Sequence, residues 1–193
     1  MSVPQLADTP PEQSFDDFAV IASQICETPI ARITLVDEHR QWFKAKVGLA
    51  ASETPRDQAL CAHTILSRDL MLVEDATKDA RFADNPLVTS DPNIRFYGGA
   101  PLVDNQGFGL GSLCVIDRKP RQLTEDQKKS LEAIARQVVA QFEFRRIAAS
   151  LAEAVAGIAV LRDFLQICAH CKSVRNDEGY CTASRNTSPR TPA

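Results

Sequence analysis

Hydrophobic and polar residues alternate with a period of two in two stretches of the chain, which predicts two β-hairpins. The first is ARITLVDEHRQWFKAKVGL (31–49), in which the polar run 37–40 predicts a solvated turn. The second joins RFYGGAPLVD (95–104) to GFGLGSLCVID (107–117). In the first hairpin we expect one side to be apolar, formed by Ile33 and Leu35 on one arm and by Phe43, Ala45 and Val47 on the other.

Two other stretches repeat at helical spacing, which predicts amphipathic helices. The repeating positions are Phe15, Phe18, Ala19, Ala22 and Ile25 in the first stretch and Leu131, Ile134, Val138 and Phe142 in the second. The first helix should end before Pro29, and the second should begin at Thr124, a residue type that caps helices. Between the hairpins we expect a short helix over 58–66 and a strand over 70–75. Hairpins with helices set between them indicate the α+β class.

A second apolar stripe follows the first along the predicted C-terminal helix. Its members are three and four residues apart: Phe144, Ile147, Leu151, Ala154, Ile158, Leu161 and Leu165. A helix that packs only on its own sheet needs one stripe, so the additional seam indicates a coiled coil with another helix. We expect a parallel homodimer through this helix; the alternative is a fold-back onto the same chain. Gly157 weakens the helix by about 1 kcal/mol relative to alanine.

Composition and charge narrow the class of protein. Of the 193 residues, 44% are hydrophobic and 24% charged, typical of a globular domain and not of a disordered chain. The formal net charge is −3 and no basic block is present, so neither nucleic acid nor an anionic membrane is an expected partner. The longest nearly apolar run, AVAGIAVL (154–161), is too short to cross a bilayer. The first twenty residues lack the features of a secretory signal, so we expect a cytoplasmic protein.

The ends of the chain are polar, which gives a division into four segments. Residues 1–13 hold three prolines and predict a flexible lead-in. Residues 14–146 would form the folded domain, and 147–166 a coiled-coil-like signalling helix. Residues 167–193 contain a short cysteine-rich stretch and end in TASRNTSPRTPA, which has no large apolar residue and is expected to be disordered.

The folded segment resembles the GAF domain family of bacterial signalling proteins. The resemblance is carried in order by ITLVDEHRQWFKAKVGL (33–49), ETPRDQALCAHTIL (53–66), LVEDATKDARFADNPLV (72–88), IRFYGGAPLVD (94–104) and LGSLCVID (110–117). It implies a central antiparallel sheet of five or six strands with flanking helices and a small-molecule pocket on one face. Domains of this family bind ligands or chromophores, or only dimerise, and they regulate attached signalling enzymes.

Cys61 and His63 form the sharpest chemical constellation, because the resemblance places them at the border of the pocket. A thiol near a helix N-terminus has its thiolate favoured, which suits chromophore attachment, metal ligation or redox sensing. Bilin-binding relatives carry their cysteine in another sequence setting, so the resemblance does not favour bilin. The alternative is that Cys61 is a small buried residue and His63 a pocket wall. The other candidate ligand-binding residues are Asp75, Phe82, Phe96 and Tyr97, of which the aromatics could equally fill the core.

Three arginines lie near acidic residues and would order the loops over the pocket: Arg56, Arg81 and Arg95. A buried arginine among them would be a candidate anchor for an anionic ligand. Cys114 lies between apolar neighbours in a predicted strand, and Cys26 ends a predicted amphipathic helix. We expect both cysteines to be structural.

Cys168 and Cys171 have the Cys-x-x-Cys spacing at which two thiolates can hold Zn²⁺. The stretch ICAHCKSVRNDEGY (167–180) resembles the start of a cysteine-rich segment found after sensory domains, whose second Cys-x-x-Cys pair is missing here. We therefore expect a truncated segment. Its pair could bind zinc, act as a redox dithiol or have no function in this form.

The sequence holds none of the usual catalytic signatures, such as a phosphate-binding loop or a His-Glu-x-x-His motif. We therefore expect a non-catalytic sensory module that binds an unidentified small ligand, dimerises through its C-terminal helix and acts on a separate output protein. The alternatives are a thiol-based redox sensor or a methionine sulfoxide reductase-like enzyme, and a purely structural dimerisation module.

Overall fold

A six-stranded antiparallel sheet with the order β3-β2-β1-β6-β5-β4 forms the centre of the first of two units, residues 1–143; the second unit is residues 144–193. The computed structural model describes the backbone of residues 8–164, 174–175 and 181–182, and the side chains of residues 8–157. The strands are β1 (Ile30–Val36), β2 (Arg40–Val47), β3 (Glu53–Pro55), β4 (Met71–Val73), β5 (Phe96–Val103) and β6 (Gly109–Asp117). Both predicted hairpins and the predicted α+β class with five or six strands are confirmed.

Among the described residues, two long helices and three short ones accompany the sheet. They are α1 (Gln13–Ile25), η2 (Arg56–Gln58), α2 (Cys61–Thr64), α3 (Pro86–Thr89) and α4 (Glu125–Phe164). Thr124 caps α4 as predicted: its Oγ1 accepts from the Gln127 amide at 3.2 Å, and Gln127 Oε1 accepts from the Thr124 amide at 3.0 Å. In the second unit, β7 (Val174–Arg175) pairs with β8 (Cys181–Thr182).

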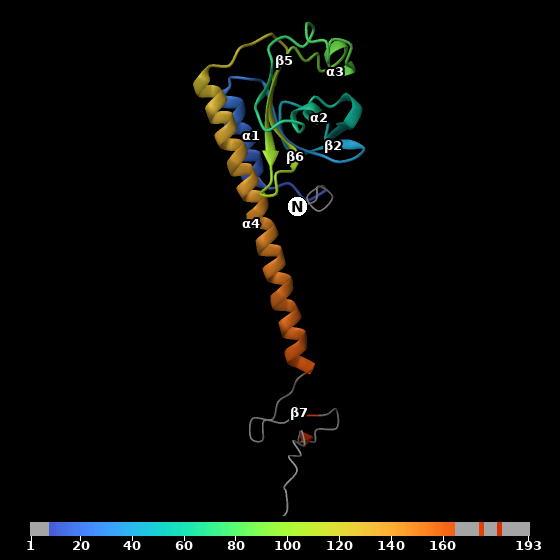
Figure 1. Ribbon diagram of the computed structural model, residues 1–193, viewed down its shortest axis with the longest axis vertical. Coiled ribbons are helices and arrows are strands. Elements are labelled where there is room, and N and C mark those ends of the chain that lie inside the picture. Colours follow the sequence, from blue (N-terminus) through green and yellow to red (C-terminus); the bar gives the residue numbers. More distant parts are fainter. Residues whose placement is uncertain (1–7, 165–173, 176–180, 183–193) are drawn as a thin grey trace, which may run out of the picture. The chain divides into compact units, whose positions relative to one another are not determined.

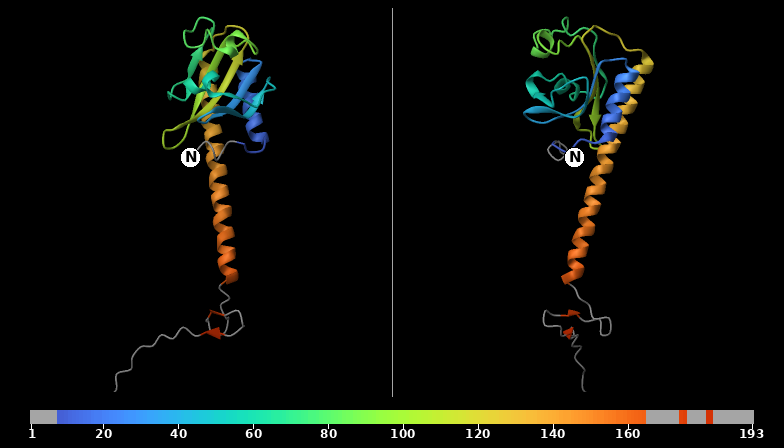
Figure 2. Two further views of the ribbon diagram at one scale, coloured as in Figure 1. Left: turned by 90° about the vertical axis from the view of Figure 1, so that its right-hand side faces the viewer. Right: turned by 180° about the vertical axis from the view of Figure 1, so that it is seen from behind.

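α1 and the first part of α4 lie side by side against one face of the sheet, which we call the α1/α4 face (Figures 1 and 2). The predicted apolar stripe of α4 is buried there, and so is that of α1 apart from Phe18, which is partly buried, and Ile25, which is exposed. The Phe15 and Phe142 rings are 4.6 Å apart between centroids. Burial of one large apolar side chain stabilises a fold by about 1.5–3 kcal/mol. This face therefore forms an ordinary hydrophobic core.

The opposite face, the α2/α3 face, is covered by the two short helices and the segments that connect them (Figure 1). Large apolar side chains are buried here as well, including Leu60, Phe82, Ile94 and Ile116. The sheet is therefore covered on both sides, and side chains from alternate positions of each strand enter one core or the other.

A β-bulge in β2 overturns one detail of the predicted first hairpin. Ile33 pairs with Ala45, but Thr34 pairs with Phe43, so Lys44 is an extra residue. An extra residue reverses the side to which the following positions point. Phe43 consequently lies on the α2/α3 face, and the expectation that it shares a side with Ala45 is wrong.

Lys44 fixes the segment before α1. Its amine donates to Thr9 Oγ1 and to the Pro10 carbonyl, both at 2.8 Å, and forms an ion pair with Glu12. The sequence predicted a flexible lead-in over 1–13. Of this segment the structure describes residues 8–13, and there the bulged lysine contacts Thr9, Pro10 and Glu12.

Candidate ligand-binding site

Polar and sulfur-bearing side chains occupy the middle of the α2/α3 face, where a domain ordinarily buries apolar residues. We call this set the polar cluster; its members are Arg32 and Thr34 of β1, Tyr97 of β5, Ser112 and Cys114 of β6, and Cys61 and Thr64 of α2. Arg32 is 3% exposed and every other member is fully buried. Such burial is tolerated only where hydrogen bonds replace the lost water.

The Tyr97 hydroxyl joins most of the polar cluster. It donates to Cys61 Sγ at 3.2 Å and lies 2.7 Å from Thr64 Oγ1 and 3.4 Å from Ser112 Oγ. Thr34 Oγ1 donates to the Ser112 carbonyl oxygen at 3.1 Å. Side chains from β1, β5, β6 and α2 are thereby connected across the sheet.

The two thiols of the polar cluster lie together, with 3.7 Å between Cys61 Sγ and Cys114 Sγ. Burial raises the pKa of Cys61. Its hydrogen bond with Cys114 and the Arg32 charge lower this pKa by more than burial raises it, so the net shift is downward. Burial and the neighbouring Cys61 charge raise the pKa of Cys114 well above its usual range. Of the two thiols beside the Arg32 guanidinium, Cys61 is therefore the one whose thiolate form the surroundings favour.

Some buried polar atoms on this face have no hydrogen-bond partner within the described structure. They are Nε of Arg32, both terminal atoms of the Gln41 amide, and Oγ1 of Thr54. Gln41 and Thr54 are opposite each other on β2 and β3, and the Arg32 guanidinium lies 4.6 Å from the centroid of the Phe43 ring. An unpartnered buried polar group destabilises a fold by about 1–3 kcal/mol. A bound molecule with complementary polar groups would remove that penalty.

Two of the predicted site residues, Cys61 and Tyr97, belong to the polar cluster and are in direct contact. Phe96, which the sequence grouped with them, lies in the core of the α1/α4 face. Neighbouring residues in a strand point to opposite faces, so Phe96 and Tyr97 cannot line the same cavity. The grouping of Phe96 with Tyr97 is therefore corrected.

The other three predicted residues lie around the polar cluster without joining it. The His63 ring packs edge-on against the buried Phe82 ring, at 4.9 Å between centroids. Asp75 binds the amide and hydroxyl of Thr77 and forms an ion pair with Lys78. These contacts lower the pKa of Asp75, chiefly through the Thr77 hydroxyl. Asp75 thus orders its own loop.

The sequence considered Arg56, Arg81 and Arg95 as anchors, but among the arginines whose side chains are described the buried one is Arg32. Arg32 and Gln41 were missed because alternation in the first hairpin marks only which side is polar. Whether that side faces water depends on what covers it, and the cover comes from residues far along the chain. The one available signal was an arginine in the middle of the apolar strand ARITLV.

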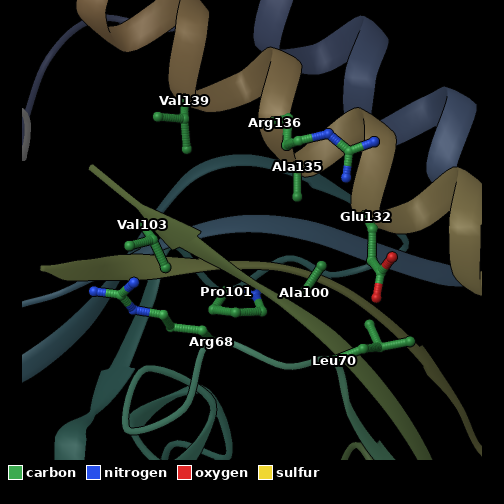
Figure 3. A pocket seen from close by; sticks show the side chains of 9 residues that line it. All are labelled: Arg68, Leu70, Ala100, Pro101, Val103, Glu132, Ala135, Arg136 and Val139. Carbon is green, nitrogen blue, oxygen red and sulfur yellow. The ribbon is translucent and has the colours of Figure 1, made fainter. Parts of the chain in front are cut away.

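A groove of about 400 Å³ lies on the other side of the sheet between α4 and β5 (Figure 3). Glu132 and Arg136 come from α4, and Arg68 extends from the segment before β4. The floor is apolar and includes Pro101 and Val103. None of the predicted site residues lines this groove.

An open hollow of about 600 Å³ borders α2, next to the polar cluster in sequence. Its lining residues are Glu38, His39, Arg56, Asp57, Ala62, His63 and Leu66. His63 is thus the predicted site residue that lines a hollow. Because Cys61 immediately precedes Ala62, the buried thiol belongs to the same turn of α2 as residues that line this hollow.

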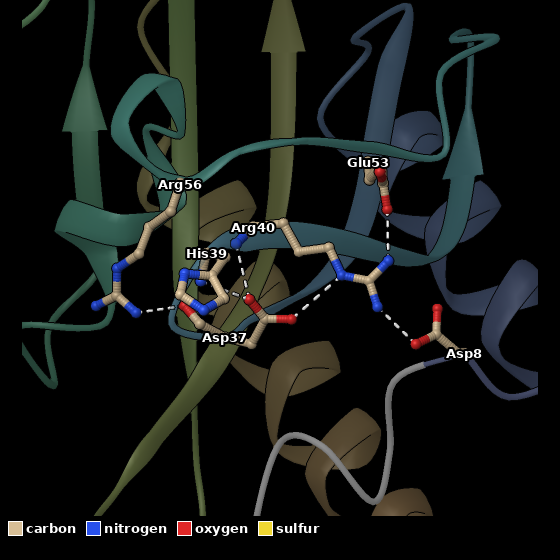
Figure 4. A network of polar contacts seen from close by, with 6 residues as sticks. All are labelled: Asp8, Asp37, His39, Arg40, Glu53 and Arg56. Carbon is tan, nitrogen blue, oxygen red and sulfur yellow. Dashed lines mark hydrogen bonds and ion pairs between the residues drawn. The ribbon is translucent and has the colours of Figure 1, made fainter.

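The turn beside the hollow is held by a network around Asp37 and Arg40 (Figure 4). Asp37 Oδ1 accepts from the backbone amides of His39 and Arg40 at 2.8 and 2.7 Å, and Arg56 donates to the Asp37 carbonyl. Burial raises the pKa of Asp37, but these backbone hydrogen bonds outweigh burial and the net shift of the pKa is downward, so the carboxylate stays ionised. Arg40 also pairs with Glu53 at 2.6 Å. Partly exposed pairs of this kind contribute only about 0–1 kcal/mol each.

Comparison with family models matches the GAF domain over residues 10–142. The chain belongs to the GAF family. GAF domains occur in signalling proteins, and this one is 46% identical over 136 residues to a cyclic di-GMP phosphodiesterase of Pseudomonas aeruginosa. The match covers 70% of this chain and 23% of that protein, so the chain spans less than a quarter of its relative.

Solved structures share the fold of this GAF domain at low identity. The GAF domain of a phosphoenolpyruvate-protein phosphotransferase from Coxiella burnetii has a TM-score of 0.60 at 15% identity, covering 77% of this chain and 92% of that one. The free methionine-R-sulfoxide reductase of Neisseria meningitidis has a TM-score of 0.58 at 17% identity, covering 76% and 87%. At such identities the likeness concerns the fold alone.

The two cysteines of the predicted zinc pair, Cys168 and Cys171, lie outside the described residues. Within the described part of the GAF chain, no group of three or more His, Cys, Asp or Glu side chains could hold a metal ion. No described helix has both the length and the hydropathy to cross a membrane.

Proposed function

We propose that this GAF domain is a regulatory module that binds a small polar ligand on its α2/α3 face and passes the signal on through a dimeric α4. The ligand would carry an anionic group for Arg32 and a donor and acceptor for the Gln41 amide. The observation that supports this is the unpartnered Nε of Arg32 in an otherwise hydrogen-bonded polar cluster, together with the unpartnered Gln41 amide on the same face. A guanidinium prefers planar anions such as carboxylate or phosphate.

The second part of the proposal concerns α4. Phe144, Ile147, Leu151 and Val155 recur on one side of this helix, and each is more than half exposed. A contiguous exposed apolar surface marks an interaction site in a soluble protein. We assign it to the same helix of a second copy, because the three- and four-residue spacing is that of a coiled coil.

The mechanism follows from differential binding. A ligand that binds one conformation of the α2/α3 face more tightly shifts the population toward it. Since strands β1 and β6 contribute side chains to both cores, a change on this face can alter the packing under α1 and α4. The proposed output is a separate signalling protein in the cytoplasm. We propose no catalytic step for this chain.

Native mass spectrometry of protein purified from its own cytosol tests the ligand. We expect the wild type to carry additional mass that denaturation releases, and Gln41→Leu to lose most of it. Gln24→Leu, which changes an exposed glutamine of α1, is the matched control and should retain the mass. Wild-type protein with the mass of the bare polypeptide would contradict ligand binding on this face.

Sedimentation analysis tests the dimer. At tens of micromolar the wild type should sediment as a dimer, and Leu151→Asp should dissociate it because a charge enters the seam. Ala149→Asp adds the same charge to an exposed position nearly opposite Leu151 on the helix and should remain dimeric. A wild type that stays monomeric would remove the signalling-helix proposal.

A further inference from the structure

The two buried thiols on the α2/α3 face lie close enough together to suggest disulfide formation, a reaction that is separate from ligand binding. Cys61 Sγ and Cys114 Sγ are 3.7 Å apart, although 53 residues separate them in sequence. A disulfide requires about 2.05 Å between the sulfurs. Side-chain rotation and a small shift of α2, a helix of four residues, could supply the difference.

The surroundings favour one thiol as nucleophile and the other as its partner. Cys61 accepts a hydrogen bond from the Tyr97 hydroxyl at 3.2 Å and lies in the field of the Arg32 guanidinium. Both interactions stabilise a thiolate, which is the form that attacks an oxidant. Cys114 remains a neutral thiol, as a resolving cysteine does before it attacks.

Cys61 of the buried pair is close in sequence to an open hollow. Cys61 is the first residue of α2, and the next two residues, Ala62 and His63, line the open hollow of about 600 Å³. Cys61 therefore belongs to the same helical turn as two residues that line the hollow. By contrast, Cys26 is buried under α1 without a second described thiol in contact, and burial raises its pKa to about 11.

We propose that Cys61 and Cys114 form a reversible disulfide in response to hydroperoxide, which makes the α2/α3 face a redox-controlled site. This inference deepens the proposed function, because it assigns a regulation to the face on which we place the ligand. The pairing itself does not depend on a ligand or on the dimer.

The reaction balances in two steps. The Cys61 thiolate attacks one oxygen of hydrogen peroxide, the O–O bond breaks, and Cys61 sulfenic acid forms while the leaving hydroxide takes a proton to become water. Cys114 then gives up its proton and attacks the Cys61 sulfur, which releases a second water and leaves the disulfide. The peroxide gains the two electrons that the thiols lose, and a dithiol reductant restores both thiols.

Oxidation would change the charge beside Arg32. The thiolate that faces the guanidinium disappears, and the buried cation is left without its negative neighbour. An anionic ligand would then be the main source of compensation. Redox state and ligand binding would in this way act on the same arginine.

Peptide mapping of the full chain tests the pairing. Reduced protein is treated with a slight excess of hydrogen peroxide, remaining thiols are alkylated under denaturing conditions, and tryptic peptides are analysed by mass spectrometry. Residues 57–68 and 96–118 form two tryptic peptides that each hold one cysteine. We expect them to appear joined, lighter by two hydrogen atoms than their sum, and to separate again with dithiothreitol.

Two variants and one internal control sharpen the result. In Cys114→Ser, Cys61 should stop at sulfenic acid that dimedone traps, whereas in Cys61→Ser the Cys114 thiol should stay alkylatable. Cys26 should remain alkylatable throughout. If Cys61 and Cys114 stay alkylatable in the wild type, or if Cys61 is oxidised without linkage to Cys114, the proposal is overturned. The wild-type map decides this even if a variant fails to fold, and it is independent of the ligand and dimer experiments.

Discussion

The two faces of the sheet are built from the same strands but differ in both filling and cover. The α1/α4 face holds apolar side chains under two long helices, as the Phe15 and Phe142 contact illustrates. The α2/α3 face holds a guanidinium, hydroxyls, a phenol and two thiols under helices of four residues.

This difference separates stability from function within one domain. An apolar core under long helices gains its free energy from burial alone. A polar core depends on complete hydrogen bonding, and the unpartnered atoms of Arg32 and Gln41 leave it incomplete. Natural proteins depart from self-consistent packing mainly at functional sites, so the α2/α3 face is where ligand and redox chemistry should be sought.

The largest expected effect is on the apolar side. Phe142→Ala removes a fully buried ring that packs on Phe15 and should lower the free energy of unfolding by about 3–5 kcal/mol. Urea denaturation measures the change. Phe108→Ala, at a phenylalanine that is 64% exposed, is the matched control and should stay within about 0.5 kcal/mol of the wild type. Similar losses for both variants would mean that α4 does not pack as described.

Alanine substitutions at two adjacent glycines of β5, which lie on opposite faces of the sheet, allow the two faces to be compared directly. A Cβ at Gly99 would lie 2.3 Å from the Tyr97 hydroxyl oxygen, whereas the nearest atom to a Cβ at Gly98 is at 3.2 Å, in the Phe96 ring. Gly99→Ala must therefore displace the phenol and should lower the free energy of unfolding by about 1–3 kcal/mol. Gly98→Ala should have the smaller effect in the same denaturation experiment. The reverse order would show that Tyr97 is free to move.

Much of the α1/α4 face could be predicted from the sequence. The stripes of α1 and α4 point to one side of each helix, and the buried positions Ala19, Leu131 and Val138 lie on those predicted stripes. Periodicity is sufficient here because each helix meets one flat apolar surface. The start of α4 at Thr124 was also predictable from its capping chemistry.

The α2/α3 face could be predicted only in part. Cys61 and Tyr97 were among the predicted site residues, but the bulge at Lys44 and the burial of Arg32 and Gln41 were not predicted. A bulge changes the side of the sheet to which the following side chains point, and it does so without a change in the types of residue. Whether the polar side of a strand is buried depends on distant segments such as α2. Local pattern contains neither kind of information.

A pH dependence of stability should come from the polar cluster. The pKa of Cys61 is lowered in the folded state, so the unfolded chain binds an additional proton below the usual thiol range near about 8.5. Stability should therefore rise toward that range, by up to about 1 kcal/mol per pH unit, and fall as the pH drops through the folded-state pKa. The raised pKa values of Cys114 and Tyr97 act with opposite sign, above the usual range of each group.

Urea denaturation at several pH values between about 6 and about 8 measures this slope. The wild type should gain stability across the series, and Cys61→Ser should gain less because serine does not titrate. The remaining slope reports the other titrating groups. Equal slopes for the two proteins would show that Cys61 is protonated in the folded state and that Arg32 has another counter-charge.

The smallest expected effect has the opposite sign to the others. Gln41→Leu replaces a fully buried amide without partners by an apolar group of similar size, so the ligand-free domain should become more stable by about 1 kcal/mol. Gln24→Leu, at an exposed position, should be neutral. A mutation that stabilises the domain and also abolishes ligand retention would show that Gln41 is kept at the expense of stability. If Gln41→Leu instead destabilises the domain, the amide has partners in the ligand-free state, and the two faces differ less than the structure indicates.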